Sequence, residues 1–151
     1  MDHKNNFKLS SNWTNLGIYG SAVLLIVLIP IFYLVMEGQE FHGGMAIAML
    51  AGVGLFGAVI YQFIYAADAR VVNGKLILKK QFRPKKEYAF ERIGDVGSFE
   101  MRRTKYVIVK MKNGDSSTEK YLIVNGNGLL AFTNKDAEEM LLSLRDGERM
   151  A

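Results

Sequence analysis

The side chains that carry most protein catalysis are scarce in this chain. Its 151 residues include two histidines, His3 and His42, and no cysteine. His3 lies at the N-terminus and His42 lies between two long apolar runs, so neither can join a catalytic group in the C-terminal part of the chain. Histidine-based acid–base or triad chemistry, and metal sites with nitrogen or sulfur ligands, are therefore not expected.

The glycines and acids of the C-terminal part do not form a recognisable site either. Gly126 and Gly128 are not followed by the Lys and the Ser or Thr of a phosphate-binding loop. Asp115 and Glu119 are two of several scattered acids beside a predicted hairpin, and we expect both to be solvated. The sequence thus predicts a protein that is not an enzyme, with no cofactor, no metal and no small-molecule substrate.

Positive side chains are the one functional class that is concentrated. Residues 67–151 contain 17 Lys and Arg against 12 Asp and Glu, a net charge of +5. Most of the clustered cations fall in two groups, with Phe82 inside the first: Lys79, Lys80, Arg83, Lys85 and Lys86, then Arg102, Arg103 and Lys105.

These two basic groups predict a surface that contacts a membrane. A Lys or Arg near anionic headgroups contributes about 1 kcal/mol, and Phe82 could dip between the lipids. The alternative is the ordinary cytoplasmic excess of Lys and Arg together with a solvated hairpin. Nucleic acid is not expected as a partner, because no known reader motif accompanies the charge.

Two uninterrupted apolar runs precede these cations in the sequence and would hold them near a membrane. Leu16 to Met36 and Gly43 to Ala66 contain no Asp, Glu, Lys, Arg or His. A helix of ~20 apolar residues matches the thickness of the bilayer hydrocarbon. The first run is longer than the ~7–15 apolar residues of a signal peptide, and no cleavage pattern closes it, so we expect two permanent membrane helices.

The charges beside the two runs predict their orientation. Lys4 and Lys8 precede the first run, and Arg70 and Lys75 follow the second, whereas the loop 37–42 has two acids and no Lys or Arg. The positive-inside rule then places both termini in the cytoplasm of a multi-pass protein of the cell inner membrane.

The second run also carries small residues at helical spacing. Such stripes let helices approach closely, because association in lipid relies on packing. The stripe either packs against the first helix or serves oligomerisation or docking on another membrane protein. Its members are Gly44, Ala48, Gly52, Gly54 and Ala58.

Beyond Arg70 the hydrophobic period changes to two, which indicates strands. Asn-Gly pairs at 73–74 and 113–114 predict two hairpins. A single helical turn is expected at 91–93. The expected strands cover 70–73, 75–82, 86–90, 95–102, 105–112, 117–124 and 129–133.

A terminal helix is expected to close the strands. Thr133 is its predicted cap, with Asp136 in the capping-box position, and Arg145 and Gly147 end it. Its apolar face consists of Ala137, Met140, Leu141 and Leu144. The predicted organisation is a cytoplasmic segment (1–15), a transmembrane helical hairpin (16–66, with helices 16–36 and 43–66) and a cytoplasmic domain (67–151).

This layout resembles that of pleckstrin-homology-like (PH-like) domains. The stretch Val71–Leu78 and the stretch Tyr88–Val96 are similar to the bacterial PH-like pattern, in which a Gly-containing hairpin precedes an aromatic–acidic–x–Ile segment. The whole chain resembles small bacterial membrane proteins of the YcxB-like type. The resemblance implies an α+β membrane protein with a PH-like antiparallel β-barrel or sandwich, and little about mechanism.

One departure from the PH pattern bears on lipid recognition. Phosphoinositide-binding PH domains place a basic cluster between their first two strands, and here the corresponding turn is taken to be Asn73-Gly74. Inositol-lipid binding by that route is therefore not expected.

The function expected from the sequence is non-enzymatic. The chain would present a PH-like interaction or scaffold domain at the cytoplasmic membrane face. The alternatives are an accessory or immunity-type subunit that binds a membrane partner or toxin, and a module that senses anionic lipid. The expected partners are the lipid bilayer and a protein, which is either another membrane protein or a second copy of the chain.

Overall fold

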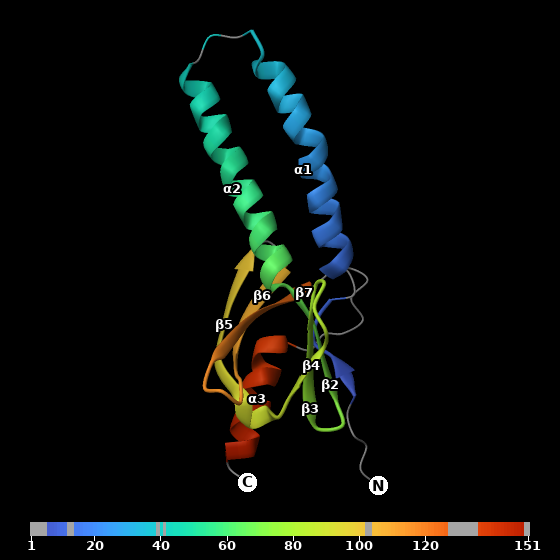
Figure 1. The fold of residues 1–151 in the computed structure, drawn as a ribbon. Helices are drawn as coiled ribbons and strands as arrows, with labels where there is room; N and C mark the ends of the chain where they lie inside the picture. Colours follow the sequence, from blue (N-terminus) through green and yellow to red (C-terminus); the bar gives the residue numbers. More distant parts are fainter. Residues whose placement is uncertain are drawn as a thin grey trace. The chain divides into compact units, whose positions relative to one another are not determined.

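The fold consists of two compact units (Figure 1). The computed structural model describes residues 6–11, 14–38, 40, 42–101, 104–126 and 136–149. Residues 15–64 form a helical unit. Residues 1–14 and 65–151 together form the other unit, which we call the strand unit.

The helical unit contains two helices of 23 residues, α1 (Thr14–Met36) and α2 (Gly43–Tyr65). Both are long and apolar enough to cross a membrane, and their bounds agree with the predicted runs to within two residues. At the start of α1, the Thr14 hydroxyl donates a hydrogen bond to the carbonyl of Ser11 (2.8 Å). Tyr19 and Phe63 meet edge to face, with ring centroids 6.1 Å apart.

The strand unit contains two antiparallel sheets and a C-terminal helix, so the predicted α+β class is confirmed at this level. Sheet A has the order β1-β2-β3-β4 and sheet B the order β5-β6-β7. The strands of sheet A are β1 (Phe7–Lys8), β2 (Ala67–Val72), β3 (Lys75–Lys80) and β4 (Lys86–Tyr88). The 3-10 turn η1 (Phe90–Arg92) leads into β5 (Ile93–Met101), β6 (Thr104–Lys112) and β7 (Thr118–Gly126), and α3 covers Ala137–Arg149.

Strand β1 is absent from the sequence-based prediction, which places residues 1–15 outside the domain. Phe7 lies opposite Val71 and Lys8 opposite Arg70. The amides of Leu9 and the next residue both donate to the carbonyl of Ala69 (2.8 and 3.3 Å). The two helices are therefore inserted between the first and second strands of one unit.

Because of this insertion, the Asn73-Gly74 turn has a different place in the order of strands from the one that the sequence predicts. It joins β2 to β3, the second and third strands, and not the first two strands of the unit. Asn73 and Gly74 have φ values of 52° and 75°, as a two-residue hairpin turn of type I′ requires. The place between the first two strands is taken by α1 and α2.

The core lies between the two sheets and under α3. The side chains of β3 alternate with the predicted period of two, with Leu76 and Leu78 buried and Lys75 and Lys79 exposed. The predicted apolar face of α3 is also confirmed, because Ala137 and Leu141 are fully buried and Met140 and Leu144 pack against the same core. The central core residues include Ile93, Val107, Val109, Met111, Tyr121 and Ile123.

The cap of α3 differs from the prediction. Asp136 is not the third residue of a capping box in the described helix but caps it directly, because its carboxylate accepts a hydrogen bond from the amide of Glu138 (2.9 Å). The helix also continues past Gly147 to Arg149. Thr133 and the predicted strand 129–133 lie outside the described residues.

Candidate functional site

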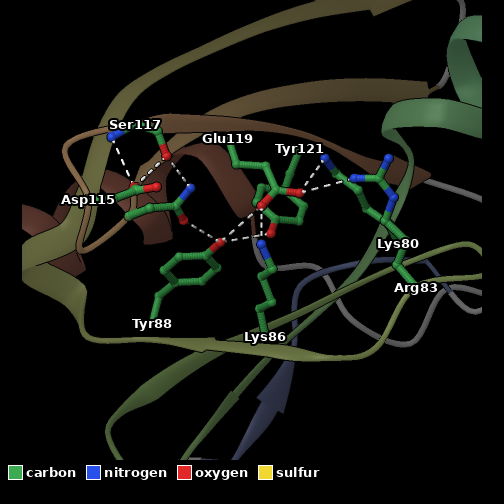
Figure 2. A network of polar contacts seen from close by, with 9 residues as sticks. Lys80, Arg83, Lys86, Tyr88, Asp115, Ser117, Glu119 and Tyr121 are labelled. Carbon is green, nitrogen blue, oxygen red and sulfur yellow. Dashed lines mark hydrogen bonds and ion pairs between the residues drawn. The ribbon is translucent and has the colours of Figure 1, made fainter.

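The basic segment around the β3–β4 connection is organised by one carboxylate, that of Glu119 on β7 (Figure 2). Lys80, the last residue of β3, donates to Glu119 Oε1 at 2.8 Å. Lys86, the first residue of β4, donates to Oε2 at 2.6 Å. Arg83 lies 3.7 Å from Oε1. Three of the five clustered cations therefore converge on a residue of the other sheet.

The backbone pattern explains why Lys80 turns inward. Residues 76, 78 and 80 of β3 share the core face, and Lys80 follows two buried leucines at the end of that row. Its side chain is only 6% exposed, and that of Glu119 is 14% exposed. A charge at this depth needs a partner, and Glu119 supplies it.

Two tyrosines complete the network. The hydroxyls of Tyr88 and Tyr121 are 2.9 Å apart, and the Tyr88 hydroxyl also donates to Glu119 (3.4 Å). The Lys80 ammonium lies 4.4 Å from the centre of the Tyr121 ring and 5.7 Å from that of Tyr65, within the range of a cation–π interaction. These contacts tie β3, β4 and β7 together.

The electrostatics of the network favour the ionised carboxylate. Burial by itself raises the pKa of Glu119, but the hydrogen bonds from Lys80 and Lys86 outweigh it and lower the pKa from 4.5 to about 2. Burial raises the pKa of Tyr121 well above its usual value of 10, and the hydrogen bond to Tyr88 raises it further. Glu119 is therefore negatively charged and Tyr121 neutral at physiological pH.

The prediction that Glu119 and Asp115 are both solvated is wrong for Glu119. Its position at the start of β7 places its side chain on the core side, toward Lys80. Asp115 is exposed and serves the β6–β7 turn, where its carboxylate accepts hydrogen bonds from the Ser117 amide (3.1 Å) and hydroxyl (2.6 Å). The sequence signal that could have found Glu119 is its even spacing from the buried Tyr121.

The remaining cations of the first group are on the surface. Lys79 is exposed and makes no hydrogen bond or ion pair with another described residue. Lys85 lies 3.8 Å from Glu87, and its side chain is 67% exposed. Lys80, in contrast, is buried and is not available to a membrane surface.

Phe82 is the most exposed large apolar side chain of the described strand unit, at 82%. Its φ of 56° is in the left-handed region, which is uncommon for a bulky residue. The connection therefore holds Phe82 outward beside Arg83.

The second basic group is described only in part. Arg102 and Arg103 lie outside the described residues. Lys105 is bound to acids, with its ammonium 2.5 Å from Asp136 and 2.7 Å from Glu138. It is therefore an anchor between β6 and the start of α3.

The predicted small-residue stripe is exposed in the helical unit. A Cβ added at Gly52 or at Gly54 would meet nothing within 4 Å, so these glycines do not pack closely against α1. At Gly44 the nearest atoms belong to the side chain of His42, whose Nδ1 accepts a hydrogen bond from the amide of Met45 (3.1 Å). Ala48 and Ala58 are also exposed.

Within the described residues, no cluster of three His, Cys, Asp or Glu could hold a metal ion. Comparison of the chain with protein-family models, with curated proteins and with solved structures gives no match.

Proposed function

We propose that this chain is a non-enzymatic protein of the bacterial inner membrane that holds a PH-like interaction domain at the cytoplasmic face. In this proposal α1 and α2 cross the bilayer, and the strand unit binds another protein or a second copy of the chain. The observation that carries the proposal is the pairing of β1 with β2.

The pairing of β1 with β2 constrains the membrane topology. Phe7 and Lys8 precede α1, and Val71 and Arg70 follow α2. Residues that share a hydrogen-bonded ladder must lie on the same side of a membrane. A chain that crosses twice and returns to the same unit satisfies this condition, and the cations beside both helices favour the cytoplasmic side.

The arrangement of the strand unit supports a PH-like domain. Its strands follow one another as antiparallel neighbours within each sheet, and a terminal amphipathic helix covers the core. This is the layout that the resemblance implies. The polar network around Glu119 faces inward and joins the two sheets, which supports a structural role for it.

The topology is tested with single cysteines, which report cleanly because the chain has none. Glu40→Cys marks the loop between the helices, and Lys112→Cys marks the exposed end of β6. In intact cells a membrane-impermeant maleimide should label position 40 and not position 112, which should react only after the membrane is opened. Labelling of position 112 in intact cells would contradict the proposal.

The interaction role is tested by purifying the tagged full-length protein from its native membrane in mild detergent and identifying what stays bound. Gly52→Leu is the matching variant, because a Cβ at this exposed position meets no atom of the chain within 4 Å, whereas a leucine would block a helix packed on the stripe. Val53→Leu, at a position 71% exposed, is the control. Loss of a stoichiometric partner or of self-association in the first variant alone would place the contact on this helix face, and no bound protein in any sample would contradict the proposed role.

A further inference from the structure

The outer face of sheet B carries a strip of apolar side chains. Residues 107, 109 and 111 of β6 point into the core, so residues 106 and 108 point outward. Two cross-strand rows extend this outward set, Phe99–Tyr106–Val124 and Gly97–Ile108–Leu122. Met101 lies on the same face beyond Phe99. We call these apolar residues the outer strip: Phe99, Met101, Tyr106, Ile108, Leu122 and Val124.

The end of the outer strip on β5 is open. Phe99 is 48% exposed and Met101 is 60% exposed. Together with Phe82, they are the exposed large apolar side chains of the described strand unit. The rings of Phe99 and Tyr106 are stacked, with centroids 4.9 Å apart and planes 9° apart, so the exposed aromatic surface is held in place.

The other end of the outer strip meets both chain segments that lead to the helices. The carbonyl of Val124 accepts a hydrogen bond from the amide of Ser11 (2.8 Å). Leu122 forms a β-bridge with Ala66 and is only 1% exposed, so the chain itself covers this end of the strip. The two residues that contact this end of the strip are close in sequence to the helices: Ser11 is three residues before α1, a length of chain that spans at most ~10 Å, and Ala66 is the residue after α2.

We propose that the open end of the outer strip lies in the headgroup region of the bilayer that α1 and α2 cross, with Phe99 and Met101 against lipid. This inference rests on the proposed membrane anchoring. Tyrosine, whose ring has a polar tip, is enriched at membrane interfaces, and Tyr106 stacks on the exposed Phe99. The next row of the same face carries Lys110, an exposed cation of the kind that suits anionic headgroups.

We favour the bilayer over a second protein as the partner because the strip is continuous with the chain segments that lead to α1 and α2. The strip adjoins the two segments that tether the unit to the apolar helices, and in the proposed anchoring these segments lie at the membrane surface. Lys110 also has an exposed acid, Asp95, within 3.1 Å, so its charge is partly balanced. The main contribution to the contact is therefore apolar.

The test uses the full-length protein in vesicles of phosphatidylethanolamine and phosphatidylglycerol. A nitroxide is attached to one introduced cysteine at a time, and its collisions with oxygen, which concentrates in lipid, are compared with its collisions with a water-soluble nickel chelate. The test positions are Phe99→Cys and, as an independent second site, Met101→Cys. Lys112→Cys, at the exposed end of β6, is the water control, and Val27→Cys in α1 is the lipid control.

The outcomes separate this inference from the proposed anchoring. If both hold, the labels at 99 and 101 have oxygen-to-nickel ratios shifted toward that of position 27 and away from that of position 112. A water-like ratio at position 27 would overturn the anchoring itself. A lipid-like ratio at 27 with water-like ratios at 99 and 101 would overturn the inference alone. Labels at 99 and 101 that are shielded from both reagents, with dipolar broadening between copies, would show a protein interface and would also overturn it.

Discussion

Among single residues, Glu119 decides how much of the basic segment is available to a partner. The run from Lys79 to Lys86 contains five cations. Glu119 binds Lys80 and Lys86 directly and lies 3.7 Å from Arg83. The positive charge that the segment presents outward is therefore smaller than its sequence suggests, because Lys80 is buried and the Glu119 carboxylate offsets one positive charge.

Replacing Glu119 with glutamine should destabilise the strand unit by about 3 kcal/mol, because removal of one partner leaves a buried charge unpaired. The charge concerned is that of Lys80, with a side chain 6% exposed. Glu87→Gln is the control, since Glu87 is 44% exposed and its partners are 3.7 and 3.8 Å away; it should cost less than about 1 kcal/mol. Hydrogen exchange of the β6 and β7 amides in the detergent-solubilised protein measures both, and equal effects would refute the assignment.

Acidification should weaken the same network. Because the pKa of Glu119 is lowered from 4.5 to about 2 in the folded protein, its contribution is present above pH 4.5 and is lost as the pH falls toward 2. Its size is on the order of 3 kcal/mol. The stability difference between the wild-type protein and Glu119→Gln should therefore shrink over this interval. A difference that stays constant down to pH 2 would show that charge is not its source.

Phe82→Gly should stabilise the β3–β4 connection. A non-glycine residue in the left-handed region costs roughly 1–2 kcal/mol, and Phe82 has a φ of 56° with 82% of its side chain exposed. The expected gain is about 1 kcal/mol in the free energy of opening of the β3 and β4 amides. Lys79→Gly, in the extended part of β3, should instead lose stability. If both variants lose stability, Phe82 makes contacts that outweigh the backbone strain.

At the scale of elements, local signals and long-range contacts differ in how well the sequence reveals them. The apolar runs predict α1 and α2 because an apolar helix of this length is identified from its own residues, without knowledge of what it packs against. The period of two and the Asn-Gly turns locate β2, β3, β6 and β7 to within a few residues. Strand β1 leaves no such signal, because its two residues are a strand only through pairing with residues more than sixty positions later.

The candidate site was predictable in part for the same reason. The cations of the basic segment are visible in the sequence, but which of them are buried depends on the register of β3 against β2 and on the approach of β7. The partial burial of Glu119 beside Lys80 results from the approach of β7 to the end of β3. The outer strip likewise depends on three strands in register, so Phe99 and Met101 have no significance in the sequence alone.

The packing of α3 gives an element-scale prediction. Leu141 is fully buried against the sheets, so Leu141→Ala should cost about 3 kcal/mol through lost burial and the cavity left behind. Ser143 is exposed on the same helix, and Ser143→Ala should change stability by less than about 0.5 kcal/mol. Hydrogen exchange of the η1 and β5 amides, which lie under α3, measures the loss. Similar values for the two variants would mean that α3 does not cover the core.

At the scale of the whole molecule, the chain is a domain interrupted by two apolar helices. The interruption falls between β1 and β2, so the fold of the strand unit requires residues from both sides of the helices. A fragment that begins at residue 67 lacks β1 and the contacts of Leu9 and Ser10 with Ala69. In the proposed topology, folding of the strand unit therefore requires that both helices be inserted in the membrane.

The most direct test of the account is a disulfide between Lys8→Cys and Arg70→Cys, formed by mild oxidation in native membranes. The two residues are opposed across the β1–β2 pair, and opposed strand residues are separated by about 4.5–5.5 Å between Cα atoms, within the range of a disulfide. The control pair, Lys8→Cys with Lys75→Cys, joins residues on non-adjacent strands. We predict rapid protection of the first pair from a thiol-reactive mass tag and no protection of the second. Free thiols at 8 and 70 after oxidation would contradict the claim that both ends of the helical hairpin return to one unit.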